Sequence, residues 1–217
     1  MIQTIQIIQN PALLRGSATC LLAGLLFATG CASSSSGTRS GAGALNEIDP
    51  VIAEMNRKRA KALEHYAKAS QLYTEGKYDE ALSEYRTTLE LDDQLYAAWN
   101  NMGQLLLNQG NYADAVSAYQ IASGLEPSDP RPEYNIGHAY QKVGWAQDAF
   151  KHFKNALERD PNYLPALHGV IRSADMLGIA DASIMKYIRT AQLRETNEQW
   201  RTYLSTQQYR VQAILDD

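Results

Sequence analysis

Residues 99–127 read WNNMGQLLLNQGNYADAVSAYQIASGLEP, and this stretch predicts two short helices joined by a tight turn. The apolar stripe of the first helix recurs at i, i+3, i+4 and i+7, as Trp99, Met102, Gly103 and Leu106. Gly110 and Asn111 break that helix, and Ala115, Tyr119 and Ala122 form the stripe of the second. Pro127 ends the second helix, because a proline disfavours helical geometry in the residue before it. Gly103 and Ala115 are small enough for two antiparallel helices to cross closely.

The same residue types return every 34 residues along the chain. The turn glycines are Gly76, Gly110, Gly144 and Gly178. The small residues of the second helices are Ala81, Ala115 and Ala149, followed by Ser183. The large aromatic residues are Tyr85, Tyr119, Phe153 and Tyr187. This period resembles the tetratricopeptide repeat (TPR) family over about residues 62–197. The resemblance implies an all-α fold, a helix-turn-helix solenoid of about four repeats that binds other proteins.

The period also predicts where the repeats lie. We expect repeats at residues 62–95, 96–129, 130–163 and 164–197, the last one degenerate. A helix over 47–61 should run into the first repeat, since Asp49 and Pro50 are typical of a helix start. Asp129 is expected to be the N-cap of the third repeat.

Residues 198–217 predict an amphipathic helix. Its apolar face includes Trp200, Tyr203, Leu204, Val211, Ile214 and Leu215. The last repeat of a solenoid exposes an apolar face, so we expect this helix to cap it. Docking to another protein, or self-association through the Trp200 face, is the alternative.

Residues 1–30 resemble the signal peptide of a bacterial lipoprotein. The apolar run from Ala18 to Ala28 is too short to cross a bilayer. Small residues then precede Cys31 as in a lipobox, although Ala28 stands where that family usually has leucine. The resemblance implies lipid attachment at Cys31. Because Ala32 is not the aspartate of an inner-membrane retention signal, it also implies the periplasmic face of the outer membrane. Ordinary secretion is the alternative, and the Ser- and Gly-rich residues 31–46 predict a flexible tether.

Other functional classes find little support. The net charge is −4 without an interleaved basic and aromatic patch, which argues against nucleic-acid binding. None of the four histidines forms the His–Glu pattern of a helical zinc protease, and no glycine-rich phosphate loop follows a strand. We therefore expect no enzyme, no metal or other cofactor and no small-molecule substrate. Cys20 lies in the cleaved segment, so the mature chain keeps Cys31 alone and no internal disulfide.

The resemblance to TPR proteins implies that the first helix of each repeat lines a concave groove. The groove residues that we select are Tyr66, Tyr73, Asn100, Asn101, Gln104, Asn108, Arg131, Tyr134, Asn135, His138, His168 and Arg172. Arg131 and Arg172 are its clearest fixed positive charges. Amides donate and accept hydrogen bonds, so we expect Asn101 and Asn135, both exposed, to bind the backbone of an extended peptide. The alternative is that the amides only solvate an unused face.

These features predict an outer-membrane lipoprotein that binds a protein or an extended peptide segment and supports assembly of an envelope complex. The main alternative is a pilotin-like factor, similar to the TPR lipoproteins that help a secretin of a pilus or secretion system to assemble. A second alternative is a scaffold that regulates peptidoglycan enzymes. A third alternative is a structural protein that self-associates through its C-terminal helix.

Overall fold

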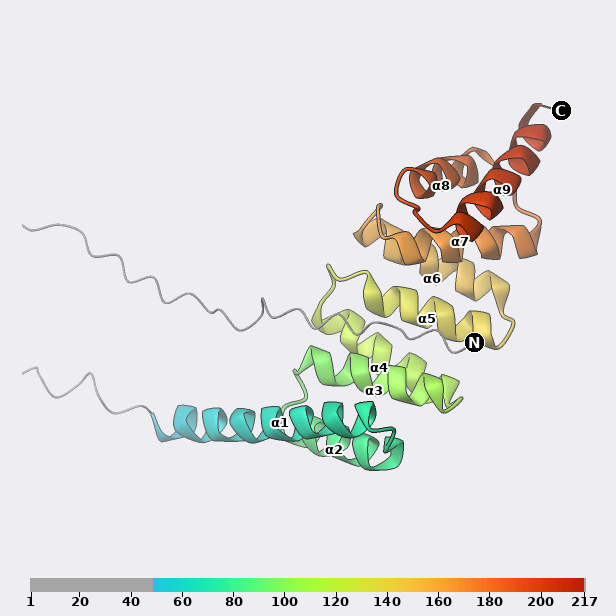
Figure 1. Ribbon diagram of the computed structural model, residues 1–217. Coiled ribbons are helices and arrows are strands. Elements are labelled where there is room, and N and C mark those ends of the chain that lie inside the picture. Colours follow the sequence, from blue (N-terminus) through green and yellow to red (C-terminus); the bar gives the residue numbers. More distant parts are fainter. Residues whose placement is uncertain (1–48, 217) are drawn as a thin grey trace, which may run out of the picture. The chain divides into compact units, whose positions relative to one another are not determined.

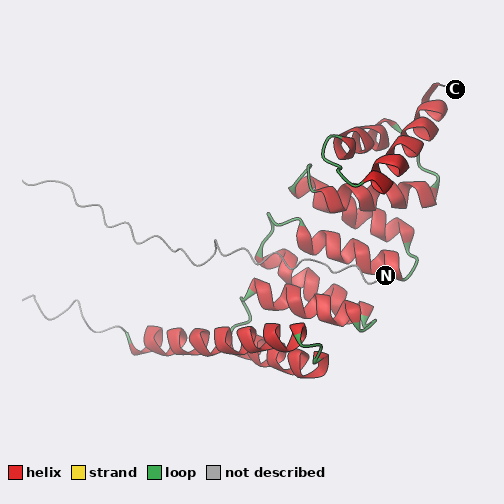
Figure 2. Cartoon of the chain, viewed as in Figure 1, coloured by secondary structure: helices red, strands yellow, loops and turns green. Residues whose placement is uncertain are grey.

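A computed structural model describes residues 49–216, and in this range every regular element is a helix (Figure 2). The helices are α1 (Pro50–Thr74), α2 (Tyr78–Leu91), α3 (Tyr96–Asn108), α4 (Tyr112–Leu125), α5 (Arg131–Lys142), α6 (Ala146–Arg159), α7 (Leu164–Leu177), α8 (Ala182–Gln192) and α9 (Glu198–Asp216). The predicted all-α fold is confirmed. None of these helices is both long enough and apolar enough to cross a membrane.

The helices pack in the order in which they occur in the chain (Figure 1). α1 pairs with α2, α3 with α4, and α5 with α6, and each second helix also packs on the first helix of the next pair. First helices additionally touch one another, α3 on α5 and α5 on α7, which builds one continuous face from them. α9 packs on α8 at the end of the array.

The helix boundaries follow local chemistry. The Asp49 side chain accepts a hydrogen bond from the Val51 N–H at 2.9 Å, and α1 then continues without a break to Thr74, as predicted. At the end of α3, Gly110 has a φ of +82°, a left-handed conformation that favours glycine. Pro127 follows α4 closely, and that helix ends at Leu125.

Glycines on the first helices face aromatic rings of the second helices. A Cβ added at Gly103 would lie 2.8 Å from Tyr119, and one added at Gly137 would lie 2.8 Å from Phe153. Both rings are almost fully buried, with exposed fractions of 0% and 1%. Ala115 is also fully buried, so the small residues do permit the close helix crossings that the period predicts.

The fourth helix pair departs from the period. α8 begins four residues after Gly178, whereas α4 begins two residues after Gly110. The longer loop shifts the buried face of α8 by one residue. Ile184 and Ile188 are buried, while Ser183 is exposed and Tyr187 is only half-buried. Tyr187 thus keeps the 34-residue spacing but lies at the edge of the core, as fits a repeat expected to be degenerate.

The start of α5 also differs from the prediction. The N-cap is Pro130, and it makes no side-chain cap bond. Asp129, expected as the cap, accepts hydrogen bonds from the backbone N–H and the side-chain Nε of Arg131, at 2.9 and 2.8 Å. A proline at the cap position has no side-chain acceptor, so the preceding carboxylate covers the first turn instead.

Candidate functional site

The predicted groove residues lie on the first helices α1, α3, α5 and α7, and hydrogen bonds link them from one repeat to the next. Asn101 Nδ2 donates to Tyr66 Oη at 3.0 Å, and Asn108 Nδ2 donates to Tyr73 Oη at 2.8 Å. Each bond spans 35 residues, one repeat plus one position. We call the set of such side chains the ladder, which consists of Tyr66, Tyr73, Asn100, Asn101, Asn108 and Asn135.

The two amides expected to be exposed are half-buried. Asn101 uses one N–H on Tyr66, and Asn135 Nδ2 donates to Asn100 Oδ1 at 3.2 Å. The expectation of full exposure was wrong, because neighbouring first helices lie close enough for their side chains to bond each other. A primary amide has two N–H donors and one carbonyl acceptor, so each amide keeps one donor and its oxygen for a ligand.

Arg131 does not contribute a free positive charge to the groove. Its Nε donates to Asp129 Oδ2 at 2.8 Å, and Tyr96 Oη donates to the same carboxylate at 2.7 Å. Burial favours a higher pKa for Asp129, but the hydrogen bonds from Arg131 and Tyr96 outweigh it and hold the pKa below its usual value. The arginine is thus neutralised within its own turn, and Gln104 is likewise engaged by donating to Asn108 Oδ1 at 3.0 Å.

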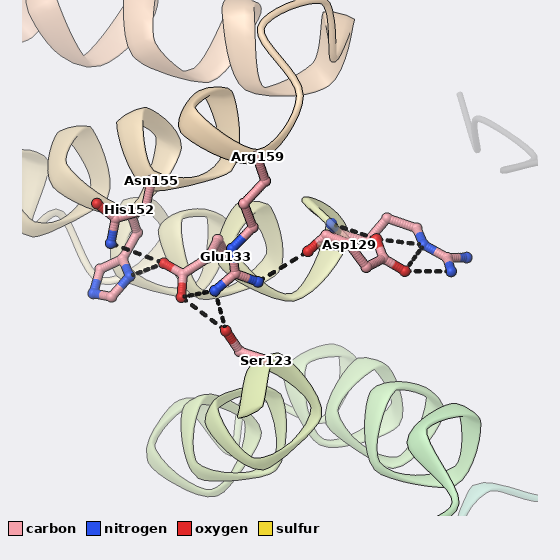
Figure 3. A network of polar contacts seen from close by, with 7 residues as sticks. Ser123, Asp129, Glu133, His152, Asn155 and Arg159 are labelled. Atoms are coloured by element: carbon pink, nitrogen blue, oxygen red, sulfur yellow. Dashed lines mark hydrogen bonds and ion pairs between the residues drawn. The ribbon is translucent and has the colours of Figure 1, made fainter. Parts of the chain in front are cut away.

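Buried polar contacts fix α5 between α4 and α6 (Figure 3). Glu133 is 8% exposed, and its carboxylate accepts hydrogen bonds from Ser123 Oγ at 3.0 Å and Asn155 Nδ2 at 3.0 Å. Two further nitrogens lie within hydrogen-bond distance of the same carboxylate, His152 Nδ1 at 2.9 Å and Arg159 Nη2 at 3.2 Å. Burial would raise the pKa of Glu133, but these bonds lower it to about 2, so the carboxylate stays charged. The network thereby positions the helix that carries Tyr134, Asn135 and His138.

A cavity of about 320 Å³ opens between α5 and α7, and we call it the α5–α7 pocket. Its walls are Tyr134, His138 and Gln141 from α5 and Leu164, Pro165, His168, Gly169 and Arg172 from α7. Phe153 of α6 and Trp200 of α9 also line it. A Cβ added at Gly169 would lie 2.6 Å from the Phe153 ring, so the glycine lets that ring approach. The structure therefore brings four selected groove residues, Tyr134, His138, His168 and Arg172, into one pocket.

Aromatic rings shape the pocket. Trp200 stacks on His168 with ring centroids 3.7 Å apart and ring planes 8° apart. The Arg172 guanidinium lies 5.0 Å from the Trp200 ring centroid, a cation–π arrangement. On the opposite wall, Tyr134 stacks on His138 at 6.1 Å. The C-terminal helix thus contributes to the groove itself as well as capping the array.

The surroundings of the pocket lower the pKa of both of its histidines. Burial lowers the pKa of His138, and the charges of Lys142 and Arg172 lower it further. Burial also lowers the pKa of His168, although Glu195 Oε2, 2.6 Å from His168 Nε2, opposes the shift. The charged side chains that act on these two histidines are therefore Arg172, Lys142 and Glu195.

The groove residues selected from the sequence do not include the polar or aromatic side chains of Gln141, Trp200 and Glu195. Gln141 occupies a groove position of the third repeat, so the period alone could have selected it. Trp200 and Glu195 reach His168 only because the chain folds back after α8, and no periodic signal marks that return. Within residues 49–216, no group of His, Cys, Asp and Glu side chains could hold a metal ion.

Comparisons with known proteins agree with this architecture. Two models described as tetratricopeptide repeat match residues 66–130 and 134–163. Human Superkiller complex protein 3 is 22% identical over 122 residues, which cover 54% of this chain and 8% of the relative. The peroxisomal targeting signal receptor of Kluyveromyces lactis is 24% identical over 137 residues, 63% of this chain and 22% of the relative. The chain thus spans less than a quarter of the length of either relative.

Solved structures show the same fold. PilF of Pseudomonas aeruginosa superimposes with a TM-score of 0.62 at 22% identity, covering 72% of this chain and 69% of PilF. YrrB, described as a TPR protein with an unusual peptide-binding site, has a TM-score of 0.60 at 17% identity, and the match covers 77% of this chain and 83% of YrrB. The first TPR of Spaghetti (RPAP3), bound to the HSP90 peptide SRMEEVD, has a TM-score of 0.52 at 24% identity, and the match covers 55% of this chain and 94% of the RPAP3 domain. Repeat period, helix pairing and matched models together show that residues 66–130 and 134–163 consist of tetratricopeptide repeats.

Proposed function

We propose that this protein is a non-enzymatic adaptor of the bacterial outer membrane, lipid-anchored at Cys31, whose first-helix face binds an extended segment of a protein partner. In this role it supports assembly of an envelope complex. The observation that carries the proposal is the ladder, which holds half-used amides in line along one face and leads into the α5–α7 pocket.

The ladder suits an extended chain for two reasons. An extended backbone offers N–H and C=O groups at regular intervals, and amides can pair with both whatever the side chains are. The hydrogen bonds between repeats already restrict the rotamers of Asn101, Asn108 and Asn135, so binding costs less side-chain entropy than it would with free amides. The pocket then offers a place for one larger group of the same segment.

The membrane anchor rests on the lipobox resemblance at Cys31, which lies outside the described residues. Eighteen positions separate Cys31 from Asp49 (49 − 31), enough for at most about 60 Å of extended chain. A tether of that length would keep the groove near the membrane surface while allowing it to turn toward a partner. Cys31→Ser should leave a soluble or uncleaved species; a variant that still fractionates with the outer membrane as mature protein would remove this part of the proposal.

The pilotin-like role is the second candidate, and the fold likeness to PilF of Pseudomonas aeruginosa is the observation that favours it. Deletion of the protein separates the two roles. Loss of secretin multimers from the outer membrane would favour the pilotin-like factor. Unchanged secretin assembly would leave the general adaptor and exclude the narrower role.

Partner capture by variants of the ladder tests whether the groove is the binding site. The double variant Asn101→Ala with Asn135→Ala removes both amides and should weaken capture by roughly tenfold to a hundredfold, at about 0.5–1.5 kcal/mol for each lost bond. Tyr66→Phe removes the same internal bond to Asn101 but keeps the amide, so it should lose only the benefit of the restricted rotamer and weaken capture less than the double variant does.

A second control lies on the exposed surface of the second helices. The pair Ser117→Ala with Lys154→Ala changes side chains of α4 and α6 and should leave capture unaffected. If the ladder double and this pair capture the partner equally well, the first-helix face is not the binding site. If Tyr66→Phe loses as much as the ladder double, the amides act on stability and do not contact the partner.

A further inference from the structure

The first part of α1 projects beyond the helix on which α1 packs. α1 has 25 residues and α2 has 14, and in Figure 1 the start of α1 extends past the end of α2. Arg59 lies 3.8 Å from Asp92, the residue that follows α2, so α2 ends beside Arg59. The first buried residue of α1 is Ala62. Residues 50–58 therefore have no neighbouring helix in the described part of the chain, and we call them the overhang.

The overhang exposes large apolar side chains at its free end. The exposed fractions of Val51, Ile52 and Met55 are 64%, 51% and 64%. Single apolar residues on a surface are ordinary, but these three lie within the first two turns of one helix. The Asp49 cap holds that first turn in helical geometry. The overhang thus presents an ordered apolar tip to the solvent.

A group of cations follows the apolar tip. Four of the five residues 57–61 are cations, namely Arg57, Lys58, Arg59 and Lys61. Successive positions of an α-helix are rotated by about 100°, so these side chains surround the helix. The whole chain has a net charge of −4, which makes this stretch a local exception. Arg57 pairs with Glu54 at 3.5 Å, whereas Lys58 and Lys61 have no acidic partner among the described residues.

The order of these groups along the helix matches the layers of a bilayer surface. Ile52 and Lys58 are six positions apart, which is about 9 Å along an α-helix. Helices that bind a bilayer surface bury apolar side chains about 5–10 Å into the boundary between headgroups and acyl chains. Long cationic side chains then reach the phosphates of the headgroups. The spacing and the charge of the overhang therefore suit a bilayer that contains anionic lipid.

The chain that precedes the overhang favours the same occupant. Under the proposed function Cys31 is lipidated, and eighteen positions connect it to Asp49. The overhang follows this tether directly, so it is the first described segment to reach the bilayer. A tether also raises the effective concentration of the membrane surface, so that a weak contact becomes populated.

We propose that the overhang binds the surface of a bilayer that contains anionic lipid, with the apolar tip at the interface and Lys58 and Lys61 at the phosphates. This inference rests on the proposed function, because the anchor at Cys31 brings α1 to the membrane. Tyr66, the first residue of the ladder, lies about 21 Å from Ile52 along the same helix, so the groove begins beyond the headgroups. The overhang alone binds weakly and is released by salt, so the lipid remains necessary for stable attachment.

Flotation with lipid vesicles tests the proposal. The protein is the mature chain of the proposed function, residues 31–217 with Cys31→Ser, which lacks the lipid and keeps every described residue. One set of vesicles is phosphatidylcholine alone, and the other contains about one third phosphatidylglycerol, an anionic lipid. The chain should bind the anionic vesicles at least about tenfold more tightly than the neutral ones, and this binding should weaken as salt is added.

A first double variant tests the cations. Lys58→Gln with Lys61→Gln should weaken binding to the anionic vesicles about thirtyfold, because each cation near such a surface contributes about fivefold. The matched control is Lys151→Gln with Lys154→Gln, two exposed lysines of α6 that are also three positions apart. This control should change binding by less than about twofold, because a cation far from the bilayer is screened.

A second double variant tests the apolar tip. Ile52→Ser with Met55→Ser should weaken binding to the anionic vesicles roughly tenfold, because less apolar surface enters the interface. Ile214→Ser with Leu215→Ser changes an exposed apolar pair at the end of α9 and should bind as the wild type does. All four double variants should keep the melting temperature of the wild type, because every altered side chain is exposed.

Equal binding to neutral and anionic vesicles, or no binding to either, would overturn the inference. So would binding to anionic vesicles that survives Lys58→Gln with Lys61→Gln. If the tip variant loses partner capture while its vesicle binding is unchanged, the overhang contacts a protein and not lipid. Such a failure is distinguishable from failure of the adaptor function, since fractionation that depends on Cys31 and capture that depends on the ladder would both remain.

Discussion

Replacing Glu133 by glutamine tests how α5 is held in place. The pKa of this carboxyl is about 2 in the folded protein against an ordinary value of 4.5, and burial works against that shift. A difference of about 2.5 units corresponds to roughly 3 kcal/mol of stability from the charged form. Because the folded-state pKa is lowered, this contribution is fully present above about pH 4.5 and is lost as the pH falls toward 2. Glu133→Gln should therefore destabilise the protein by about 3 kcal/mol at pH 7.

Urea unfolding followed by circular dichroism at pH 7 and at pH 3.5 measures the effect. The difference between the wild type and Glu133→Gln should narrow by about 1 kcal/mol at the lower pH, since the wild type has begun to lose the contribution. Glu90→Gln, at an exposed glutamate of α2, should change stability by less than about 0.5 kcal/mol at either pH. A difference in stability for Glu133→Gln that is the same at both pH values, or below about 1 kcal/mol at pH 7, would show that the charged carboxylate does not stabilise the fold in this way.

Thermal or urea unfolding of single variants checks the close helix contacts. Gly137→Ala brings a methyl group to 2.8 Å from the Phe153 ring and should cost roughly 1–3 kcal/mol, whereas Gly124→Ala meets nothing within 4 Å and should be neutral or stabilising. Ala115→Leu adds three carbons at a fully buried position and should also cost roughly 1–3 kcal/mol; an unchanged midpoint would mean that α3 and α4 do not cross there. Gly110→Ala should cost about 1–2 kcal/mol because of the left-handed backbone at φ +82°, and no cost would contradict that turn geometry.

The sequence predicted the parts of the fold that local chemistry repeats. A glycine 34 residues from the next ends a helix in each repeat, and a glycine on the first helix faces an aromatic ring on the second. These contacts lie within one repeat, so the 34-residue period along the chain predicts which residues meet in the folded structure. The same logic placed Tyr134, His138, His168 and Arg172 on the first helices.

Contacts that depend on loop length or on side-chain reach between repeats were less predictable. Two extra loop residues before α8 moved the core position from Tyr187 to Ile188, which the period does not signal. The bond from Asn101 to Tyr66 and the stacking of Trp200 on His168 join residues of different units. Whether such side chains bond each other or face solvent depends on how closely the helices approach, and helix spacing is a property of the packed structure.

Site-specific photocrosslinking in cells tests whether the first-helix face binds the partner. A photoreactive amino acid replaces Ala67, an exposed residue on the first-helix face next to the ladder, or Lys154, an exposed residue of α6. Mass spectrometry then maps the segment captured from each position. We expect the photoreactive group at position 67 to capture one continuous segment of a partner protein and the group at position 154 to capture little of it. Capture of that partner at equal yield from both positions, or from position 154 alone, would show that the first-helix face is not the binding site.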